Sequence, residues 1–384
     1  MIAKLILAVF VANFLLHTTL GATNKVICYY ESWTNQSHFP PDDIDVSTCT
    51  HVNFAFLRLN DDGNFRFDDG ADDSVLQKFG SLKSTNPDVK LLITLGGWTE
   101  DSMAFSHVAA DPHKKSTLAS TLIHYMQTYN LDGIDIDWEY PGQNGGTPDD
   151  KENFVDLLSV VRKALDDNGG GVITVAVSAN PDPDSYNVNA ISKVVDAIIV
   201  MTFDYHGTQD DKTTGENSPL YASSADTDPN ANCDASINNW LNSGADPSKM
   251  ILGLGFYGHV FELTDPEQHA VGSPANGANA DYTSYSEVLF HLKNYCKKFG
   301  LKYFQICQLA DGWTEEWDDE QEVPYKYSNT QWIGYDNSQS IKLKVEYAKS
   351  RNLGGVMMWA VNDDDKDAVC GEKSPLLQAI KDNL

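Results

Sequence analysis

Four acidic residues fall within eight positions of the segment LDGIDIDWEY, residues 131–140. Asp135, Asp137 and Glu139 are two residues apart, and alternate residues of a β-strand project from the same face. The residues between them are apolar, so we expect the three carboxyl groups to point into the interior of a barrel. Desolvation and mutual repulsion oppose ionisation there, and the three groups should titrate as a coupled set.

The chemistry predicted for this segment is proton transfer. Glu139 comes last, so we expect it at the C-terminal mouth of the strand, between Trp138 and Tyr140. A carboxyl group that keeps its proton near neutral pH can donate it to a glycosidic oxygen. The alternative is a divalent-metal site, but histidine and further acids at ligand spacing are missing nearby. We therefore predict neither a metal nor a cofactor.

The rest of the chain predicts the scaffold that positions these groups. Short, nearly continuous apolar runs recur along it, as expected for parallel strands covered on both faces. Segments with helical spacing, such as 116–129 and 153–165, lie between them. Repeated strand–helix alternation predicts an α/β fold, a (β/α)8 TIM barrel, whose sites gather at the C-terminal ends of the strands. The runs are residues 25–30, 50–57, 90–95, 133–138, 171–177, 197–203, 250–256 and 355–360.

The interval between the seventh and eighth runs is far longer than one crossover needs. It holds tyrosine and phenylalanine clusters, two cysteines and a helical pattern of its own. We interpret residues 259–335 as a small α+β insertion subdomain that rises beside the C-terminal face of the barrel. The domain prediction is thus residues 23–384, with this insertion after the seventh strand.

Composition and the N-terminus set the context. The formal net charge is −28, with 55 acidic against 27 basic residues, which disfavours nucleic acid and anionic membranes as partners. Residues 1–22 resemble a signal peptide, since one lysine precedes a short apolar core and small residues follow. We expect a secreted, monomeric protein whose six cysteines pair as disulfides. Asn35 begins a possible glycosylation sequon.

The segment Asp132-Gly133-x-Asp135-x-Asp137-x-Glu139 resembles the signature of glycoside hydrolase family 18, the chitinases. Further segments, from residue 26 to the C-terminus, are similar to other motifs of that family. These segments are residues 26–33, 49–56, 95–98, 201–207, 255–258, 303–307 and 354–359.

The resemblance implies a retaining reaction in which the substrate's own acetamido group is the nucleophile, an exception to the two-carboxylate scheme. Glu139 would act as acid and then base, Asp137 would orient the acetamido group, and Asp135 would share a proton with Asp137. Asp132 and Gly133 would be structural. The implied partner is chitin or N-acetylglucosamine oligosaccharides.

The resemblance also assigns substrate-binding residues, with Trp359 as the pocket floor. Tryptophans at strand ends can stack on sugar rings, which supports three of these positions independently. The implied disulfides are Cys28–Cys49 and Cys307–Cys370, while Cys233 and Cys296 stay unassigned. The substrate-binding set is Tyr30, Trp33, Phe56, Gly97, Trp98, Tyr140, Met201, Phe203, Asp204, Tyr257, His259 and Trp359.

Several residues depart from the family pattern. Phe203 stands where a tyrosine would position the acetamido oxygen, and Tyr205 is a candidate to replace that hydroxyl. His259 stands in place of an arginine, Thr94 in place of a serine and Asn362 in place of an aspartate. These departures leave open a chitin-binding lectin or growth-factor-like homologue, and an endoglycosidase acting on N-linked glycans shares the carboxylate motif. The intact acids favour an enzyme over the lectin, and the match at residues 303–307 in a long insertion favours chitin over N-linked glycans as the substrate.

Overall fold

The computed structural model describes residues 24–34, 39–68, 70–98, 102–208, 210–278 and 301–384. The predicted signal peptide, Asn35 and Cys296 lie outside these residues. Within the described part of the chain, no helix is long and apolar enough to cross a membrane.

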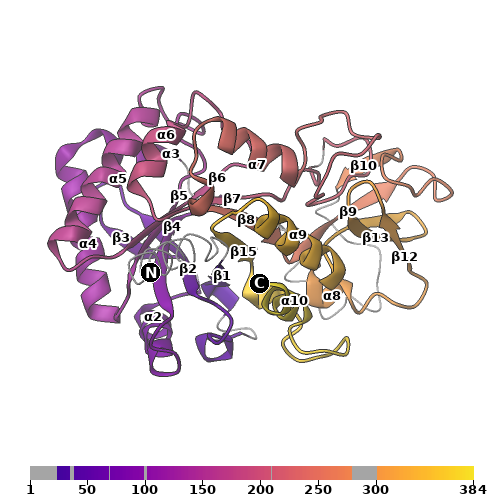
Figure 1. Ribbon diagram of the computed structural model, residues 1–384, viewed down its shortest axis with the longest axis horizontal. Coiled ribbons are helices and arrows are strands. Elements are labelled where there is room, and N and C mark those ends of the chain that lie inside the picture. The colour runs from indigo at the N-terminus through magenta and orange to yellow at the C-terminus, as the bar shows by residue number, and fades with distance from the viewer. Residues whose placement is uncertain (1–23, 35–38, 69, 99–101, 209, 279–300) are drawn as a thin grey trace, which may run out of the picture.

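The centre of the fold is a closed barrel of eight parallel strands, which confirms the predicted (β/α)8 class (Figure 1). Closure is direct, because β1 pairs in parallel with both β2 and β15. All eight predicted runs form barrel strands, although β7 ends at Val200, three residues earlier than expected. The barrel strands are β1 (Lys25–Glu31), β2 (His51–Leu59), β4 (Lys90–Gly96), β5 (Gly133–Asp137), β6 (Val172–Val177), β7 (Ala197–Val200), β8 (Met250–Gly255) and β15 (Gly355–Trp359).

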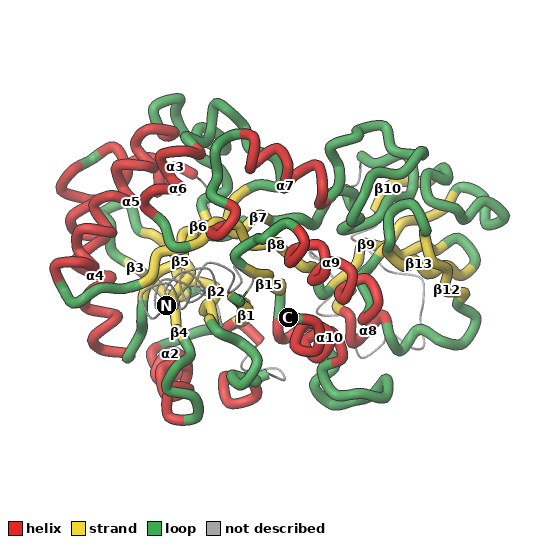
Figure 2. Tube along the Cα trace, viewed as in Figure 1, coloured by secondary structure: helices red, strands yellow, loops and turns green. Residues whose placement is uncertain are grey.

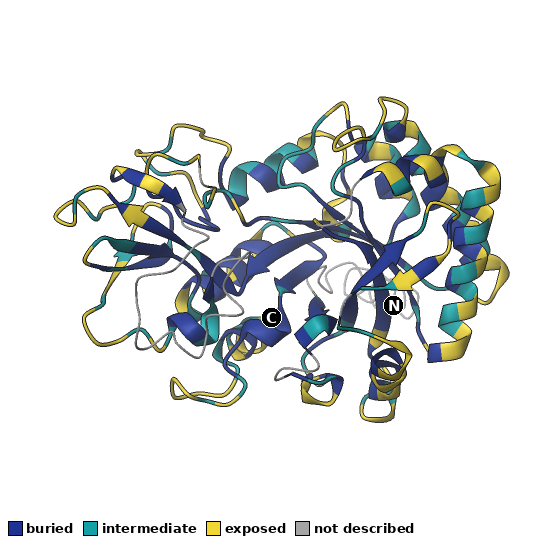
Figure 3. Cartoon of the chain, turned by 180° about the vertical axis from the view of Figure 1, so that it is seen from behind, coloured by how far each residue is buried: buried dark blue, intermediate teal, exposed yellow. Residues whose placement is uncertain are grey.

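Helices surround the barrel, and their outer faces are exposed while the strands are buried (Figures 2 and 3). Several begin with a capping side chain that satisfies free backbone N–H groups, such as Asp111 before α4 and Asn337 before α9. The helices are α2 (Asp73–Gly80), α3 (Ser102–Ala110), α4 (Pro112–Tyr129), α5 (Asp150–Asp167), α6 (Val188–Val194), α7 (Cys233–Asn242), α8 (Tyr303–Ile306), α9 (Ser338–Ser350) and α10 (Pro375–Asn383).

Alternation along each strand divides the buried residues into two layers. In β1, Cys28 and Tyr30 join the large core between barrel and helices. Ile27 and Tyr29 instead join a smaller cluster inside the barrel. The barrel wall is tight at β5, where a Cβ on Gly133 would lie 1.9 Å from the carbonyl oxygen of Val172. Only glycine fits at this position, so β5 is held at a fixed height against β6.

A second, six-stranded antiparallel sheet stands beside the barrel (Figure 1). Its strands run in the order β10, β9, β14, β13, β12, and β11 pairs with β9. The predicted limits of the insertion subdomain, 259–335, stay a prediction. The strands are β9 (Tyr257–Leu263), β10 (Ala275–Ala278), β11 (Leu301–Lys302), β12 (Thr314–Asp318), β13 (Val323–Ser328) and β14 (Gln331–Gly334), while β3 (Phe65–Phe67) pairs with β2 of the barrel.

Two disulfides brace the fold, and they are the ones that the family resemblance implied. Cys28 and Cys49 join β1 to the segment before β2, with Cα atoms 5.9 Å apart. Cys307 and Cys370 join the end of α8 to the segment before α10, with Cα atoms 6.0 Å apart. Cys233 is buried as a free thiol at the start of α7.

A buried ionic cluster ties the first and last barrel strands to the second sheet. The Lys302 ammonium contacts the carboxylates of Glu31 and Asp363, both almost fully buried. Beside it, the Asn362 amide accepts a hydrogen bond from the Glu31 N–H (2.8 Å) and donates to the Glu31 carbonyl and the Thr34 hydroxyl. An aspartate could accept but not donate, which accounts for the asparagine at 362.

Replacing Lys302 with methionine should destabilise the protein by about 3–5 kcal/mol at pH 8, because two buried carboxylates lose their cation. The loss should shrink at pH 5, since protonation can neutralise Asp363, whose pKa burial has raised. Burial already raises the pKa of Asp363 to about 7. Urea unfolding at both pH values measures the effect.

The matched control is Lys366→Met, which breaks a pair with Asp43 (2.9 Å) between more exposed side chains. It should cost less than about 1 kcal/mol at either pH. Equal losses for the two variants would contradict the importance given to the Lys302 cluster.

Candidate active site

Three carboxyl groups line the C-terminal half of β5 and its end, as the spacing predicts. Asp135 is fully buried inside the barrel, where its two oxygens accept hydrogen bonds from the Tyr29 hydroxyl (2.5 Å) and the Thr174 hydroxyl (2.6 Å). Burial raises the pKa of Asp135, while these hydrogen bonds oppose the rise. Asp135 is therefore fixed in orientation at the bottom of the row.

Asp137 lies one step nearer the mouth and is also buried. Its Oδ1 has no hydrogen-bond partner among the described residues. Burial, then the nearby charges of Glu139 and Asp135, raise the pKa of Asp137 well above its ordinary value, and the Arg58 guanidinium partly opposes this. Buried polar atoms are normally hydrogen-bonded, so the unpaired Oδ1 indicates that Asp137 can form a hydrogen bond with a bound ligand.

Glu139 follows β5 at the barrel mouth and is half-buried. Burial raises its pKa to about 7, a hydrogen bond from Tyr140 opposes the rise, and the Asp204 carboxylate adds to it. Burial, and then the charge of Glu139 and the hydrogen bond to it, raise the pKa of the Tyr140 hydroxyl. Glu139 thus holds a proton up to near neutral pH at a place that solvent reaches, which is what a general acid requires.

Asp132 lies at the opposite end of β5. One carboxylate oxygen accepts from the Leu91 backbone N–H (2.8 Å) and contacts the Lys83 ammonium (2.8 Å). This acid joins β5 to the N-terminal end of β4, far along the strand from the other three.

Aromatic rings from three strand ends form one wall of the mouth. The rings of Trp33, Phe56 and Trp359 contact one another, with the ring centre of Phe56 5.9 Å from that of Trp33 and 5.6 Å from that of Trp359, and the two indole centres 6.4 Å apart. Trp359 also contacts Tyr29, at 5.3 Å between ring centres. Since Tyr29 binds Asp135, the aromatic wall and the carboxylate row share one residue.

Trp98 and Gly97 follow β4 at the edge of the same mouth. Trp98 is 64% exposed, an unusually high exposure for a large apolar residue. A Cβ on Gly97 would lie 2.6 Å from the Phe56 ring, so the backbone can approach the aromatic wall only as glycine. An exposed indole ring at the end of a barrel strand is a suitable surface for stacking on a pyranose.

Asp204 and Tyr257 meet at the ends of β7 and β8. The Tyr257 hydroxyl donates to the Asp204 carboxylate (2.6 Å), and the His259 Nε2 lies 2.6 Å from the same oxygen. The Asp204 side chain is 56% exposed, so it can also face a bound ligand. His259 occupies its position with the ring close over Gly207.

Phe203 packs inside the mouth with Met201, Tyr257 and Trp359. Tyr205 does not replace its missing hydroxyl, because the Tyr205 side chain packs into the outer core and its hydroxyl hydrogen-bonds to Ser236 (2.7 Å). Phe203 therefore presents an apolar edge at a point where the family pattern places a hydroxyl.

Tyr30 is a correction to the predicted substrate-binding set. It is fully buried in the outer core, and its hydroxyl donates to the Phe39 carbonyl (3.0 Å). Tyr29 takes the inward position instead and was missed, as were Thr174 and Arg58. The alternation of β1 would have found Tyr29, because Cys28 forms a disulfide outside the barrel and its neighbours in sequence face the opposite way.

The described residues offer one close group of potential metal-binding side chains, Cys307, Asp365 and Cys370. Its two sulfur atoms form a disulfide and cannot act as thiolate ligands. The carboxylate row of β5 is not part of such a group.

The barrel thus places a carboxyl group with a pKa of about 7 at the end of its fourth strand, above two buried acids and beside a wall of aromatic rings. The family model "Glycosyl hydrolases family 18" matches residues 25–364. The chain therefore belongs to glycosyl hydrolases family 18.

Relatives within this family include enzymes and a protein described as a pseudo-chitinase. Chitotriosidase-1 of Mus musculus is 33% identical, over 96% of this chain and 80% of its own length. The structure of the Ostrinia furnacalis Group IV chitinase is 36% identical with a TM-score of 0.85, covering 94% of this chain and all of that one. Human YKL-39, "a pseudo-chitinase with retained chitooligosaccharide binding properties", is 29% identical with a TM-score of 0.83, covering 94% of this chain and 99% of that one.

Replacing Asp204 with asparagine should lower the pKa of Glu139 from about 7, because it removes a negative charge that disfavours the second carboxylate. Titration of protein carrying ¹³C-labelled glutamate side chains, followed by NMR, measures this pKa. Asp184→Asn removes an exposed acid that does not act on Glu139 and should leave the titration unchanged. A Glu139 pKa that is the same in both variants would contradict the proposed electrostatic coupling.

Proposed function

We propose that this protein is a secreted chitinase that hydrolyses β-1,4-linked N-acetylglucosamine polymers or oligomers with retention of configuration. The observation that carries the proposal is Glu139, a carboxyl group at the barrel mouth whose pKa is raised to about 7. A group with this pKa can give its proton to a leaving oxygen and later take one from water. Membership of the family supports the proposal, since several relatives are named as chitinases.

In the proposed reaction, the Glu139 proton passes to the glycosidic oxygen as its bond to C1 breaks. The acetamido oxygen of the same sugar forms a new bond to C1, which gives a cyclic oxazolinium ion. Glu139, now a carboxylate, then takes a proton from the water that opens this ring. Both displacements occur at C1, so the product keeps the original configuration.

Asp137 lies next to Glu139 in the row and has a carboxyl oxygen that is available to hydrogen-bond to the acetamido group. Its unpaired Oδ1 can accept a hydrogen bond from the acetamido N–H and stabilise the positive charge of the oxazolinium ion. Asp135, held by Tyr29 and Thr174, can share a proton with Asp137 without moving. The roles therefore separate, with one group that transfers a proton and two that control charge.

The aromatic wall supports a polysaccharide rather than a small polar substrate. Trp359, Phe56 and Trp33 present ring surfaces inside the mouth, and Trp98 presents an exposed ring at its edge. Pyranose rings expose apolar C–H faces that pack on such surfaces, so several sugars can be held in a row. Two chitinases of Ostrinia furnacalis with similar structures have been solved in complex with allosamidin and with a chitin oligosaccharide.

A second candidate function is binding of chitin oligosaccharides with little or no hydrolysis. The observation that favours it is Phe203, because no hydroxyl stands at this position and Tyr205 does not supply one. The intact row of Asp135, Asp137 and Glu139 favours the enzyme, since pure binding has no use for a protonated acid at the mouth.

Replacing Glu139 with glutamine should lower hydrolysis of N-acetylglucosamine hexamer by on the order of 100-fold to 10,000-fold, because the proton donor is lost. Binding of the hexamer should persist, since glutamine keeps the size and polarity of the side chain. Product analysis by chromatography and calorimetric titration measure the two effects, and the products also separate endo from exo action.

The control is Glu346→Gln, an exposed glutamate of α9 that pairs only with the neighbouring Lys342 among its described contacts. Its hydrolysis should match that of the unaltered protein. Cleavage by the Glu139→Gln variant at the full rate would show that another group is the acid.

Replacing Phe203 with tyrosine should raise turnover of a chromogenic chitobioside by on the order of 10-fold to 100-fold, because the new hydroxyl can position the acetamido oxygen. Phe203→Leu, which adds no hydroxyl, serves as the control and should not raise the rate. An unchanged or lower rate for the tyrosine variant would sink this explanation of Phe203.

A further inference from the structure

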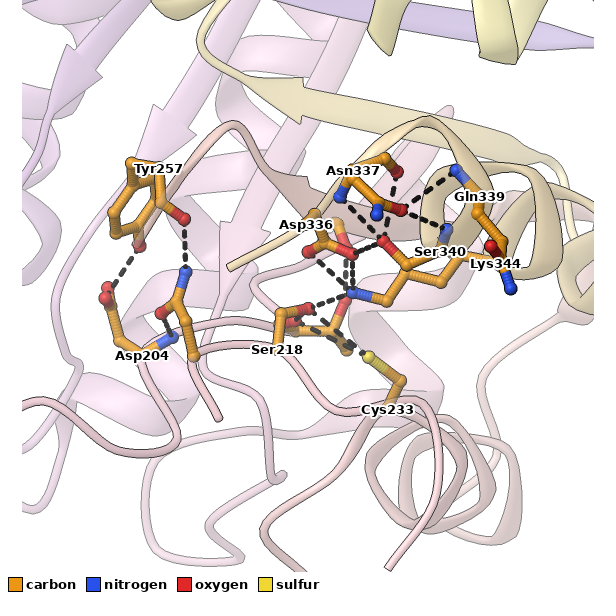
Figure 4. A network of polar contacts seen from close by, with 12 residues as sticks. Asp204, Ser218, Cys233, Tyr257, Asp336, Asn337, Gln339, Ser340 and Lys344 are labelled. Atoms are coloured by element: carbon orange, nitrogen blue, oxygen red, sulfur yellow. Dashed lines mark hydrogen bonds and ion pairs between the residues drawn. The ribbon is translucent and has the colours of Figure 1, made fainter. Parts of the chain in front are cut away.

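Asn217 is a fully buried side chain in the long loop between β7 and α7. Its Oδ1 accepts a hydrogen bond from the backbone N–H of Asp204 (3.0 Å). Its Nδ2 donates to the backbone carbonyl of Tyr257 (3.0 Å). One amide group thus bridges the backbones of two residues 53 positions apart, whose side chains meet at the mouth (Figure 4).

The Asn217 side chain supports a backbone conformation at Asp204 that is energetically unfavourable by itself. Asp204 has a φ of 58°, in the left-handed region that non-glycine residues avoid. The bond from its N–H to Asn217, and a further one from the Tyr205 N–H to the Asn217 carbonyl (3.2 Å), hold this turn in place. Without them, relaxation of the turn would carry the Asp204 carboxylate away from Tyr257.

Room for the bridge is provided by β8. A Cβ on Gly255 would lie 3.1 Å from the Asn217 Nδ2, a tight contact, so a side chain there would press on the amide. The carboxamide accepts through its oxygen and donates through its nitrogen, whereas an ionised aspartate side chain of the same size can only accept. An aspartate would set a carboxylate oxygen against the Tyr257 carbonyl oxygen.

Ser218, the next residue, is equally buried but faces a different partner. Its hydroxyl donates to the Thr202 carbonyl (2.6 Å) and accepts from the Lys344 ammonium (2.8 Å), which is paired with Asp336 (Figure 4). The Ser218 hydroxyl has no contact with Asp204 or Tyr257. Asn217 is therefore bonded to residues of the mouth, whereas Ser218 is bonded only to residues of the surrounding scaffold among these contacts.

We propose that Asn217 is a positioning residue of the active site, which acts on substrate only through Asp204 and Tyr257. By fixing both backbones, it sets the distance of the Asp204 carboxylate from the sugar and from Glu139. The inference rests on the proposed hydrolase function, because it assigns a role in that reaction to a residue that does not touch substrate.

The test is a double-mutant cycle of Asn217→Ala and Asp204→Ala on N-acetylglucosamine hexamer. Asn217→Ala alone should lower kcat/KM on the order of 10-fold to 100-fold, as expected when a substrate contact is misplaced. In the Asp204→Ala background the same change should cost less than about 2-fold, because the group it positions is gone. Asn217→Ala should also move the alkaline limb of the pH profile to lower pH, as loss of the Asp204 charge does.

Ser218→Ala is the matched control, and its effect should be the same with and without Asp204. Equal losses for Asn217→Ala in both backgrounds would overturn the proposal and leave Asn217 a scaffold residue. Should Asn217→Ala fail to fold, Asn217→Asp preserves volume and the bond from the Asp204 N–H, and the same cycle applies to it.

Failure of the hydrolase proposal has a different signature. If the unaltered protein binds the hexamer without cleaving it, the chitinase proposal is wrong. The cycle is then measured on the Kd for the hexamer, where dependence of the Asn217 effect on Asp204 supports the positioning role and independence overturns it.

Discussion

The structure depends on burying carboxyl groups beside one another on a single strand. Asp135 and Asp137 lie inside the barrel, and Glu139 follows at its rim, so every ionisation adds charge to an environment that solvates charge poorly. Hydrogen bonds from Tyr29 and Thr174 oppose the rise in the pKa of Asp135, and the charge of Arg58 partly opposes the rise at Asp137. The pKa is thus raised by burial at all three carboxyl groups, with different further influences at each. Glu139, the one at the rim, is the group that can exchange its proton with solvent.

The aromatic wall and the Asp204–Tyr257 pair are connected to this row by contact rather than by sequence. Tyr29 touches Trp359 and binds Asp135, while the Asp204 charge raises the pKa of Glu139. Groups from β1, β5, β7, β8 and β15 therefore influence one another at the mouth. A change in charge or packing at one of these strand ends is therefore expected to affect its neighbours at the mouth.

The barrel and the carboxylate row could be predicted from the sequence, because both depend on local patterns. Eight apolar runs mark the eight barrel strands, and the two-residue spacing of the acids fixes their common face. The direction in which a side chain points depends on the register of its strand, and it is harder to predict from the sequence. Tyr30 was placed in the site although β1 turns it outward, and Asn217 carries no local signal, since its partners Asp204 and Tyr257 are brought to it only by the folded loop and β8. Asn362 is a similar case, where the choice of amide becomes intelligible only beside the Glu31 backbone.

Closure of the barrel has a consequence for biosynthesis. The strand that seals the barrel, β15, pairs with β1 at one edge and β8 at the other, and it ends in Trp359. A ribosome makes β1 and the three acids before it makes β15, so the three acids are synthesised while the barrel still lacks the strand that closes it. In that state the acids have ordinary solvation and ordinary proton affinity. The buried environment that raises the pKa of the acids is therefore complete only when the last strand of the barrel has paired with the first.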